Sequence, residues 1–401
     1  MCIFVKIDVM IDINKYEAEL VFVQLRKKYS EHPITIIAGP HDLHDYALGH
    51  MRNHQLMFRG CVFTYPFEII ELVDISRVRS VFEMNYEYCL FEDLVRIQRI
   101  DLEFQLSMSD VCFNSNMNIV DAHFKMVFIL ERAVFKNNLF ILGATFDSTV
   151  GLDSVSAHQI EVTRSDFNRE LNCLAFEDVN MLRMEGTNVQ RLNFHTFSKT
   201  SVNLIDISIS NFFRCYDLSL RMLNMNGIAI HNGYLLVKKL NVERTNQETC
   251  RLIKHEAYRA NDQILGMEYK VREMKEYMKE VRHWKTASTY LLLLLNKWSN
   301  NFGKSWTRGS LFTFVCWISC FGIFVVLRDF VGDHSVQSIT GYIKESVNYL
   351  WLLNGLSGLL DDTGNTCWWL AIMLVVVFVL GKILIGYGIY QTISAFRRFG
   401  K

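Results

Sequence analysis

The sequence has little proline and no net charge. Only three of its 401 residues are proline, and all three (Pro33, Pro40 and Pro66) lie before residue 67, so no later strand or helix loses a backbone donor to proline. Its 42 basic side chains are balanced by 42 acidic ones, which excludes a strong overall field that would attract nucleic acid or acidic partners. A site for a charged ligand must therefore come from a local cluster.

Motifs of known chemistry are also missing. None of the ten cysteines forms a CxxC pair or a zinc-ligand spacing, and the sequence contains no P-loop, GxSxG, HExxH or GxGxxG. We therefore expect a protein that is not an enzyme, with no catalytic residues, no metal and no cofactor. Several cysteines stand in apolar strings, which is typical of reduced core residues in a cytosolic domain.

Residues 1–58 are predicted to form a small α/β unit. Residues 2–11 and 34–38 have the composition of strands, and residues 13–29 have the apolar spacing of an amphipathic helix. The apolar start of the chain is broken by Lys6 and by acidic residues, unlike a signal peptide. We expect this unit and the region that follows it, up to about residue 290, to stay in the cytosol.

Residues 59–249 contain a repeat. A small residue two positions before a large apolar residue, usually phenylalanine, recurs every eleven residues and then at double that spacing. The large apolar residue of this pattern is Phe124, Phe146, Phe167, Val189 and Phe212, in steps of 21 to 23. A period near 20 built from short strands predicts a β-solenoid, or β-helix, of about 22 residues per coil. A β-sandwich is the alternative, but tight hairpins need glycine or proline, and both are sparse here.

Residues 250–308 are predicted to link the solenoid to the membrane. The segment from 250 to about 290 has opposite charges at helical spacing (Glu268, Arg272, Glu276 and Lys279), which favours one long helix. This helix would either pack along the solenoid or bundle with copies of itself.

Residues 309–401 are predicted to form a membrane module with two transmembrane helices. Residues 309–327 carry no charge, and at ~1.5 Å per residue they cross a ~30 Å hydrocarbon core. Residues 367–390 form the second span, with tryptophans at one end and tyrosines at the other. Basic residues precede the first span and follow the second, whereas acidic residues dominate the loop between them. The positive-inside rule then places both termini in the cytoplasm.

Two features of this module exceed the needs of an anchor. Lys382 lies inside the second span, where an ammonium costs roughly 2.5 kcal/mol or more unless it is hydrated or paired, although its long stem could also let it snorkel. Residues 346–360 are apolar but too short to cross, which predicts a re-entrant helix or one lying on the outer leaflet. Lys382, Asn354 and Ser357 are our candidate pore or gate residues. Glycines in the second span offer close helix packing: Gly381, Gly386 and Gly388.

Basic residues recur with the period of the solenoid. Two series are present: Arg169, Arg191 and Arg214, and Lys199, Arg221 and Arg244. Equivalent positions in a solenoid stack about 4.8 Å apart, so like charges would form ladders that repel unless acids or a bound anion compensate. The alternatives are a solvated ladder or a strip for the phosphates of a nucleotide or oligonucleotide.

Three segments resemble bacterial pentapeptide-repeat-like membrane proteins, in which a right-handed β-helix precedes a linker helix and paired spans. They are Thr249-Cys-Arg-Leu-Ile-Lys-His-Glu-Ala257, Asn296-Lys-Trp-Ser-Asn-Asn-Phe-Gly303, and Ile389-Tyr-Gln-Thr-Ile-Ser-Ala-Phe-Arg-Arg398. The resemblance covers about residues 100–401, whereas residues 1–58 resemble no family that we can name.

The layout is also similar to channel-forming effectors of bacterial phage-defence operons, including the Hailong type. The resemblance implies a homo-oligomeric channel, most simply a tetramer, in the bacterial inner membrane. Its solenoid would sense a nucleotide or oligonucleotide made by a partner enzyme. The alternative is a membrane-tethered scaffold whose solenoid binds a protein partner.

Overall fold

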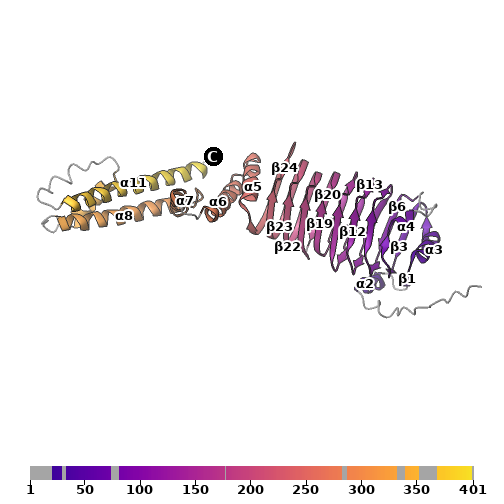
Figure 1. The fold of residues 1–401 in the computed structure, drawn as a ribbon. Helices are drawn as coiled ribbons and strands as arrows, with labels where there is room; N and C mark the ends of the chain where they lie inside the picture. Colours follow the sequence, from indigo (N-terminus) through magenta and orange to yellow (C-terminus); the bar gives the residue numbers. More distant parts are fainter. Residues whose placement is uncertain are drawn as a thin grey trace, which may run out of the picture. The chain divides into compact units, whose positions relative to one another are not determined.

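The computed structural model describes residues 20–28, 33–73, 81–176, 178–281, 287–331, 339–351 and 368–399. The chain divides into two compact units, Met1–Asp262 and Gln263–Lys401 (Figure 1). The strand expected at residues 2–11 and the first half of the helix expected at 13–29 lie outside the described residues.

The first unit is a β-solenoid preceded by a short α/β region. Its helices are α2 (Leu20–Lys28), α3 (Pro40–His50), α4 (Ile70–Val73) and α5 (Gln247–Arg259). Its strands are β1 (Thr35–Ile37), β2 (Met51–Arg52), β3 (Gln55–Arg59), β4 (Cys61–Phe63), β5 (Phe67–Glu68), β6 (Glu83–Glu87), β7 (Leu90–Phe91), β8 (Val95–Gln98), β9 (Asp101–Leu102), β10 (Gln105–Ser109), β11 (Cys112–Phe113), β12 (Met117–Val120), β13 (His123–Phe124), β14 (Phe128–Glu131), β15 (Val134–Phe135), β16 (Asn138–Leu142), β17 (Thr145–Phe146), β18 (Val150–Asp153), β19 (Ala157–Thr163), β20 (Asp166–Phe176), β21 (Val179–Glu185), β22 (Asn188–Ile205), β23 (Ser208–Asn226), β24 (Ala229–Ile230) and β25 (Tyr234–Thr245).

Successive coils pair in parallel, one behind the next (Figure 1). Leu106 pairs with Phe128 and Met117 with Leu139, a step of 22 residues in each case, and about nine such turns stack. Along each strand the inward side chains are buried and the alternate ones face outward, as the two-residue period of a strand requires. The predicted fold class and repeat length are therefore confirmed.

Each coil has two long sides. The first long side contains β3, β6, β10, β14 and β18 and continues into β20, β22, β23 and β25. The second contains β5, β8, β12, β16, β19 and β21 and continues into the later parts of β22, β23 and β25.

Stacked aromatic rings fill the corners between the long sides. Phe124, Phe146 and Phe167 form one stack, with ring centroids 4.7 and 4.9 Å apart, as the repeat predicted. Val189 continues this column, but the next member is Ile209. The prediction for Phe212 is wrong, because an additional residue in β23 moves Phe212 to an outward position beside Arg191.

A second stack explains the eleven-residue spacing. Phe63, Phe91, Phe113 and Phe135 lie at the opposite corner, with successive ring centroids 4.4, 5.0 and 4.4 Å apart. Phe135 follows Phe124 by half a coil, so the pattern marks two corners of one coil. Only the first of these corners was predicted from the sequence.

The chain turns at the end of each long side through a residue with positive φ. These residues recur once per coil: Gly60, Tyr88, Asp110, Arg132, Ser154, Ala175, Thr196, Asp217 and Lys239 after the first side, and Arg99, Asp121, Gly143, Arg164, Gly186, Asp206 and Gly227 after the second. A Cβ at Gly143 would crowd the carboxylate of Asp121 on the preceding coil, so glycine serves both the turn and the stacking there. Most of the other turns use residues other than glycine, which is why sparse glycine is compatible with this fold.

Helix α5 covers the last coil and protects its open edge. The Thr249 hydroxyl accepts from the Met225 amide at 2.7 Å, and the Glu256 carboxylate accepts from the Leu235 amide at 3.4 Å. The helix ends where Asn261 takes positive φ and the Asp262 amide donates to Ala257, a Schellman-type ending.

The single helix predicted from 250 to about 290 is therefore wrong. The structure has three helices there: α5, α6 (Gln263–Glu280) and α7 (Ala287–Asn300). The signal for the first break was Asn261, one of the few residue types that tolerate a left-handed backbone.

The second unit contains α6, α7, α8 (Trp306–Val331), α9 (Ile339–Leu350) and α11 (Trp368–Phe399). Two segments are long and apolar enough to cross a membrane, Trp306–Asp329 in α8 and Ile372–Arg397 in α11. Both predicted spans thus coincide with helices, although each helix extends beyond the predicted bounds.

Candidate functional site

The two long helices of the second unit pack antiparallel (Figure 1). Three pairs of facing residues mark their contact: Gly309 with Thr392, Thr313 with Gly388, and Cys320 with Gly381. Each step along α8 is matched by an equal step back along α11. A Cβ at Gly388 would overlap with the Thr313 hydroxyl, so the helices approach where small residues allow it.

Two of the three glycines predicted for helix packing, Gly381 and Gly388, thus lie in contacts. Gly386 lies half-buried between them. Gly309 on α8 plays the same part, although the expected packing glycines all lay in the second span.

Helix α9 turns back along α8. The Trp317 indole donates to the Ser346 carbonyl at 2.8 Å, and the Arg328 guanidinium forms an ion pair with Glu345. Residues 346–350 of the short helix predicted at 346–360 form the end of α9, which begins at Ile339. Residues 352–360, including the pore candidates Asn354 and Ser357, lie outside the described residues.

Lys382 holds the end of α9. Its ammonium donates to the carbonyl oxygens of Tyr349 at 2.7 Å and Trp351 at 2.6 Å. The same nitrogen lies 5.2 Å from the ring centroid of Tyr349 and 5.0 Å from that of Phe378. A positive charge at the C-terminal end of a helix is favourable because the last carbonyls carry partial negative charge and lack partners within the helix.

This cluster lies at the middle of the candidate spans. Trp317 stands eleven residues from Trp306 and twelve from Asp329, and Lys382 stands ten residues after Ile372. The last turn of α9 therefore reaches the level of the span centres. Of the two alternatives for Lys382, the geometry is that of a paired ammonium within the unit.

Tyr349 anchors the last turn of α9. Its ring packs among Phe321, Phe324 and Phe378, with centroids 5.6 Å away in each case, and a Cβ at Gly381 would overlap with its hydroxyl. This role of Tyr349 was not predicted from the sequence. The available signal was Gly381, which leaves room opposite a large side chain.

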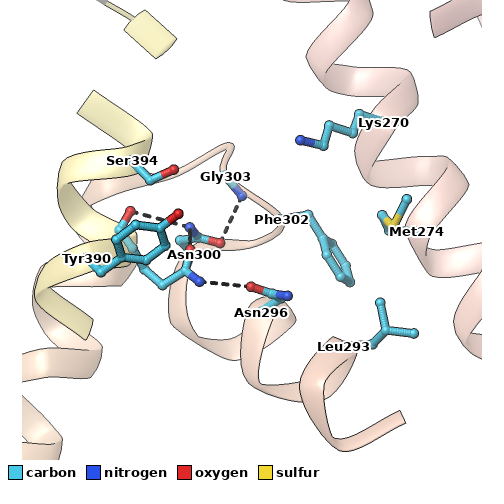
Figure 2. Close-up of a pocket in the computed structure, with 10 residues that line it drawn as sticks. Lys270, Met274, Leu293, Asn296, Asn300, Phe302, Gly303, Tyr390 and Ser394 are labelled. Carbon is cyan, nitrogen blue, oxygen red and sulfur yellow. Dashed lines mark hydrogen bonds between the residues drawn. The ribbon is translucent and has the colours of Figure 1, made fainter. Parts of the chain in front are cut away.

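A second polar cluster joins α7 to α11 (Figure 2). The Asn300 side chain donates to the Gln391 side chain and accepts from the Gly303 amide at 2.8 Å. Asn296 accepts from Gln391 at 3.0 Å and from the Tyr387 hydroxyl at 2.8 Å. Asn300 and Gln391 are both buried, so this network fixes the turn before α8 against the end of α11.

The two basic ladders expected on the solenoid do not form. In the backbone register, Arg191 lies opposite Glu170 on one coil and Phe212 on the next, and Arg214 lies opposite Asn193 and Leu236. The reason is that additional residues at β-bulges near Arg169 and Asn211 shift the register.

The second series, Lys199, Arg221 and Arg244, does not stack as a ladder either. Arg244 pairs with Met222 instead of Arg221, and Lys199 lies at a positive-φ bend after Ser198, which pairs with Ser219.

Arg191 and Arg214 nevertheless meet at Phe212. Their guanidinium carbons lie 6.0 and 4.1 Å from its ring centroid. The outward positions of the first long side gather basic, histidine and aromatic side chains here, which we call the Arg–aromatic face: Arg191, His195, Phe212, Arg214, Tyr216 and Tyr234.

The Arg–aromatic face differs from the earlier coils in its charge balance. In the earlier coils, basic groups contact acids of a neighbouring coil. Arg132 contacts Asp110 at 2.7 Å, and Lys125 contacts Glu103 at 2.6 Å. Within the described part of the chain, Arg191 and Arg214 have no acidic partner within ion-pair distance, and the Nε of each is buried without a hydrogen bond.

The core beneath this face is apolar. Burial raises the pKa of the Cys173 and Cys215 thiols, so both stay protonated at neutral pH. All eight cysteines within the described ranges are free thiols, and no group of three or more metal-ligating side chains occurs within those ranges.

Comparison of the chain with protein-family models, curated proteins and solved structures gives no significant match.

Proposed function

We propose that the chain is a subunit of a homo-oligomeric membrane channel whose pore module is built from α8, α9 and α11. The observation that carries this proposal is the helix end at mid-span. The Tyr349 carbonyl in the last turn of α9 and the Trp351 carbonyl just after the helix face the Lys382 ammonium at the centre of the candidate spans.

A simple anchor does not need this arrangement. Ionisable groups inside a membrane are costly, and irregular backbone is tolerated at that depth only where it is buried in protein or lines a water-filled cavity. A half-helix that ends inside the span, together with a charged group, is the layout that channels and transporters use to handle ions.

The proposal requires several copies of the chain. Two full helices and one half-helix cannot enclose an aqueous path, so a tetramer is the simplest assembly. We propose the bacterial inner membrane as its location, with both termini cytoplasmic, because basic residues such as Arg308 and Arg397 flank the spans on that side.

Conductance tests the proposal directly. The purified full-length protein, reconstituted in a planar lipid bilayer, should produce discrete current steps, whereas bilayers without protein should stay silent. A protein that inserts and never conducts, with or without oligonucleotide, would contradict the channel and favour the scaffold alternative.

We further propose that the Arg–aromatic face senses a nucleotide or oligonucleotide made by a partner enzyme, as in a bacterial defence effector. Arginines without acidic partners match phosphate oxygens, and the aromatic rings beside them suit base stacking. Phe212 and Tyr234 lie on neighbouring coils with ring centroids 6.5 Å apart, which gives the face more than one stacking surface.

Charge reversal should abolish this binding. In the double variant Arg191→Glu and Arg214→Glu, affinity for a single-stranded oligodeoxynucleotide should fall by at least about 100-fold, because two phosphate contacts become repulsive. Fluorescence anisotropy measures the affinity, which should also fall as salt rises in the unmutated protein.

A matched double reversal serves as the control. Arg221→Glu with Arg244→Glu makes the same change in net charge away from the Arg–aromatic face and should leave the affinity within about threefold, since distant exposed charges are screened. Equal losses in both double variants would mean that only net charge matters and would refute the site.

A further inference from the structure

The second unit contains a cavity of about 250 Å³ at one end of the candidate spans. Its walls come from α6, α7, the turn at Phe302–Gly303 and the end of α11. One side of the wall is apolar, made by Met274, Leu293 and Phe302. Figure 2 shows Lys270 reaching toward the opening from α6, with Tyr390 and Ser394 on α11 opposite.

The polar lining of the cavity has two parts, a group of side-chain amides and a group with one ammonium and two hydroxyls. Asn296, Asn300 and Gln391 bind one another and the Gly303 amide, so they form a fixed floor. Lys270 and the hydroxyl-bearing Tyr390 and Ser394 line the cavity beside that floor. One cation and two hydroxyl donors around a small cavity are suited to the oxygens of a phosphate group.

The cavity lies near the end of a span. Ser394 precedes Arg397, the last residue of the candidate span in α11, by three residues. This is the basic end of both spans, where the sequence has Lys297, Lys304 and Arg308. Lipid phosphates occupy this level of a bilayer, and basic pockets between membrane helices on the cytoplasmic side bind lipid headgroups.

Helix α7 supplies a separate observation. Leu291, Leu292 and Trp298 are exposed on it, although they are apolar or aromatic, and Lys297 stands beside the tryptophan. A helix with an exposed apolar side and an indole, directly before a span, is typical of an interfacial helix lying among headgroups. The outer side of α7 and the cavity behind it therefore belong at the same membrane level.

We infer that this cavity binds the phosphate of an anionic phospholipid headgroup on the cytoplasmic leaflet. Lys270, Tyr390 and Ser394 contact the phosphate oxygens, and the apolar wall meets the glycerol and the first part of an acyl chain. The cavity is smaller than the ~300–1,000 Å³ of sites for drug-sized ligands, which suits a headgroup and excludes a whole lipid. The inference requires membrane insertion and is independent of conductance.

Native mass spectrometry of the full-length protein in detergent tests the inference. Phosphatidylglycerol should bind the unmutated protein at least about tenfold more tightly than phosphatidylcholine. Lys270→Gln should remove most of this preference, because a hydrogen bond to a charged group is worth ~1.5–3 kcal/mol, or roughly ten- to 100-fold in affinity. Ser394→Ala should weaken binding less, and Lys254→Gln on α5 should leave it unchanged.

Each other outcome overturns the inference. Equal binding of phosphatidylglycerol by the unmutated protein and Lys270→Gln would exclude the cavity as the site. Glycerol 1-phosphate binding as tightly as the lipid would assign the cavity to a soluble phosphate ester. If Lys270→Gln does not fold, as judged by gel filtration, Ser394→Ala decides, and its unchanged lipid preference would refute the site.

Discussion

Replacing Phe146 with alanine should destabilise the solenoid by about 3–5 kcal/mol, the usual cost of deleting a buried phenylalanine. Its ring is fully buried and stacks between Phe124 and Phe167 on the neighbouring coils. The cavity would therefore lie between three consecutive coils, and in a solenoid the contacts between neighbouring coils supply the stability. Urea unfolding of the full-length protein, followed by far-ultraviolet circular dichroism, measures the change.

Phe212→Ala is the matched control. Phe212 was expected in the same stack, but it lies outside it on the outward side of β23. Its truncation should therefore cost about 1 kcal/mol or less, in the range of partly exposed substitutions. Equal losses for Phe146→Ala and Phe212→Ala would contradict the register described above and restore the one that the repeat predicted.

Replacing Lys382 with methionine should change both stability and conductance. The carbonyls of Tyr349 and Trp351 would lose a charged donor at mid-span, at a cost of about 1.5–3 kcal/mol. The same loss would shift the balance between held and released positions of α9 by roughly ten- to 100-fold. Open probability in a planar bilayer should change by a factor in that range, and the thermal unfolding temperature in detergent should fall.

Two further variants separate charge from position. Lys382→Arg keeps the charge and the donors, so it should retain most of the stability that methionine loses. Lys344→Gln removes a lysine from the exposed side of α9 and should leave open probability within about threefold, since no span contact is lost. Unchanged conductance and stability in Lys382→Met would mean that the ammonium does not hold α9.

The sequence was informative where the signal is local. Mean hydropathy over about 20 residues identifies both spans, because the cost of exposing polar groups to lipid adds residue by residue. The recurrence of Phe124, Phe146 and Phe167 identifies the solenoid and its coil length, since a stacked coil must bury a large apolar residue at the same place each time.

Tertiary structure decided what depends on register. The bulges beside Arg169 and Asn211 each add one residue, which shifts the register of the residues that follow and brings Arg191 and Arg214 to one ring. A bulge has no reliable sequence signature, because its cost depends on how the next coil packs. The period near 22 residues could thus be predicted, and the pairing of any one arginine could not.

The same distinction applies in the membrane module. The sequence by itself determined that Lys382 lies within an apolar helix and that a short apolar segment precedes that helix. Only the tertiary structure decided that the ammonium meets the carbonyls of Tyr349 and Trp351, more than 30 residues away in the chain. The physical reason is that hydropathy is a property of each segment, whereas a hydrogen bond depends on the depth at which α9 ends between α8 and α11.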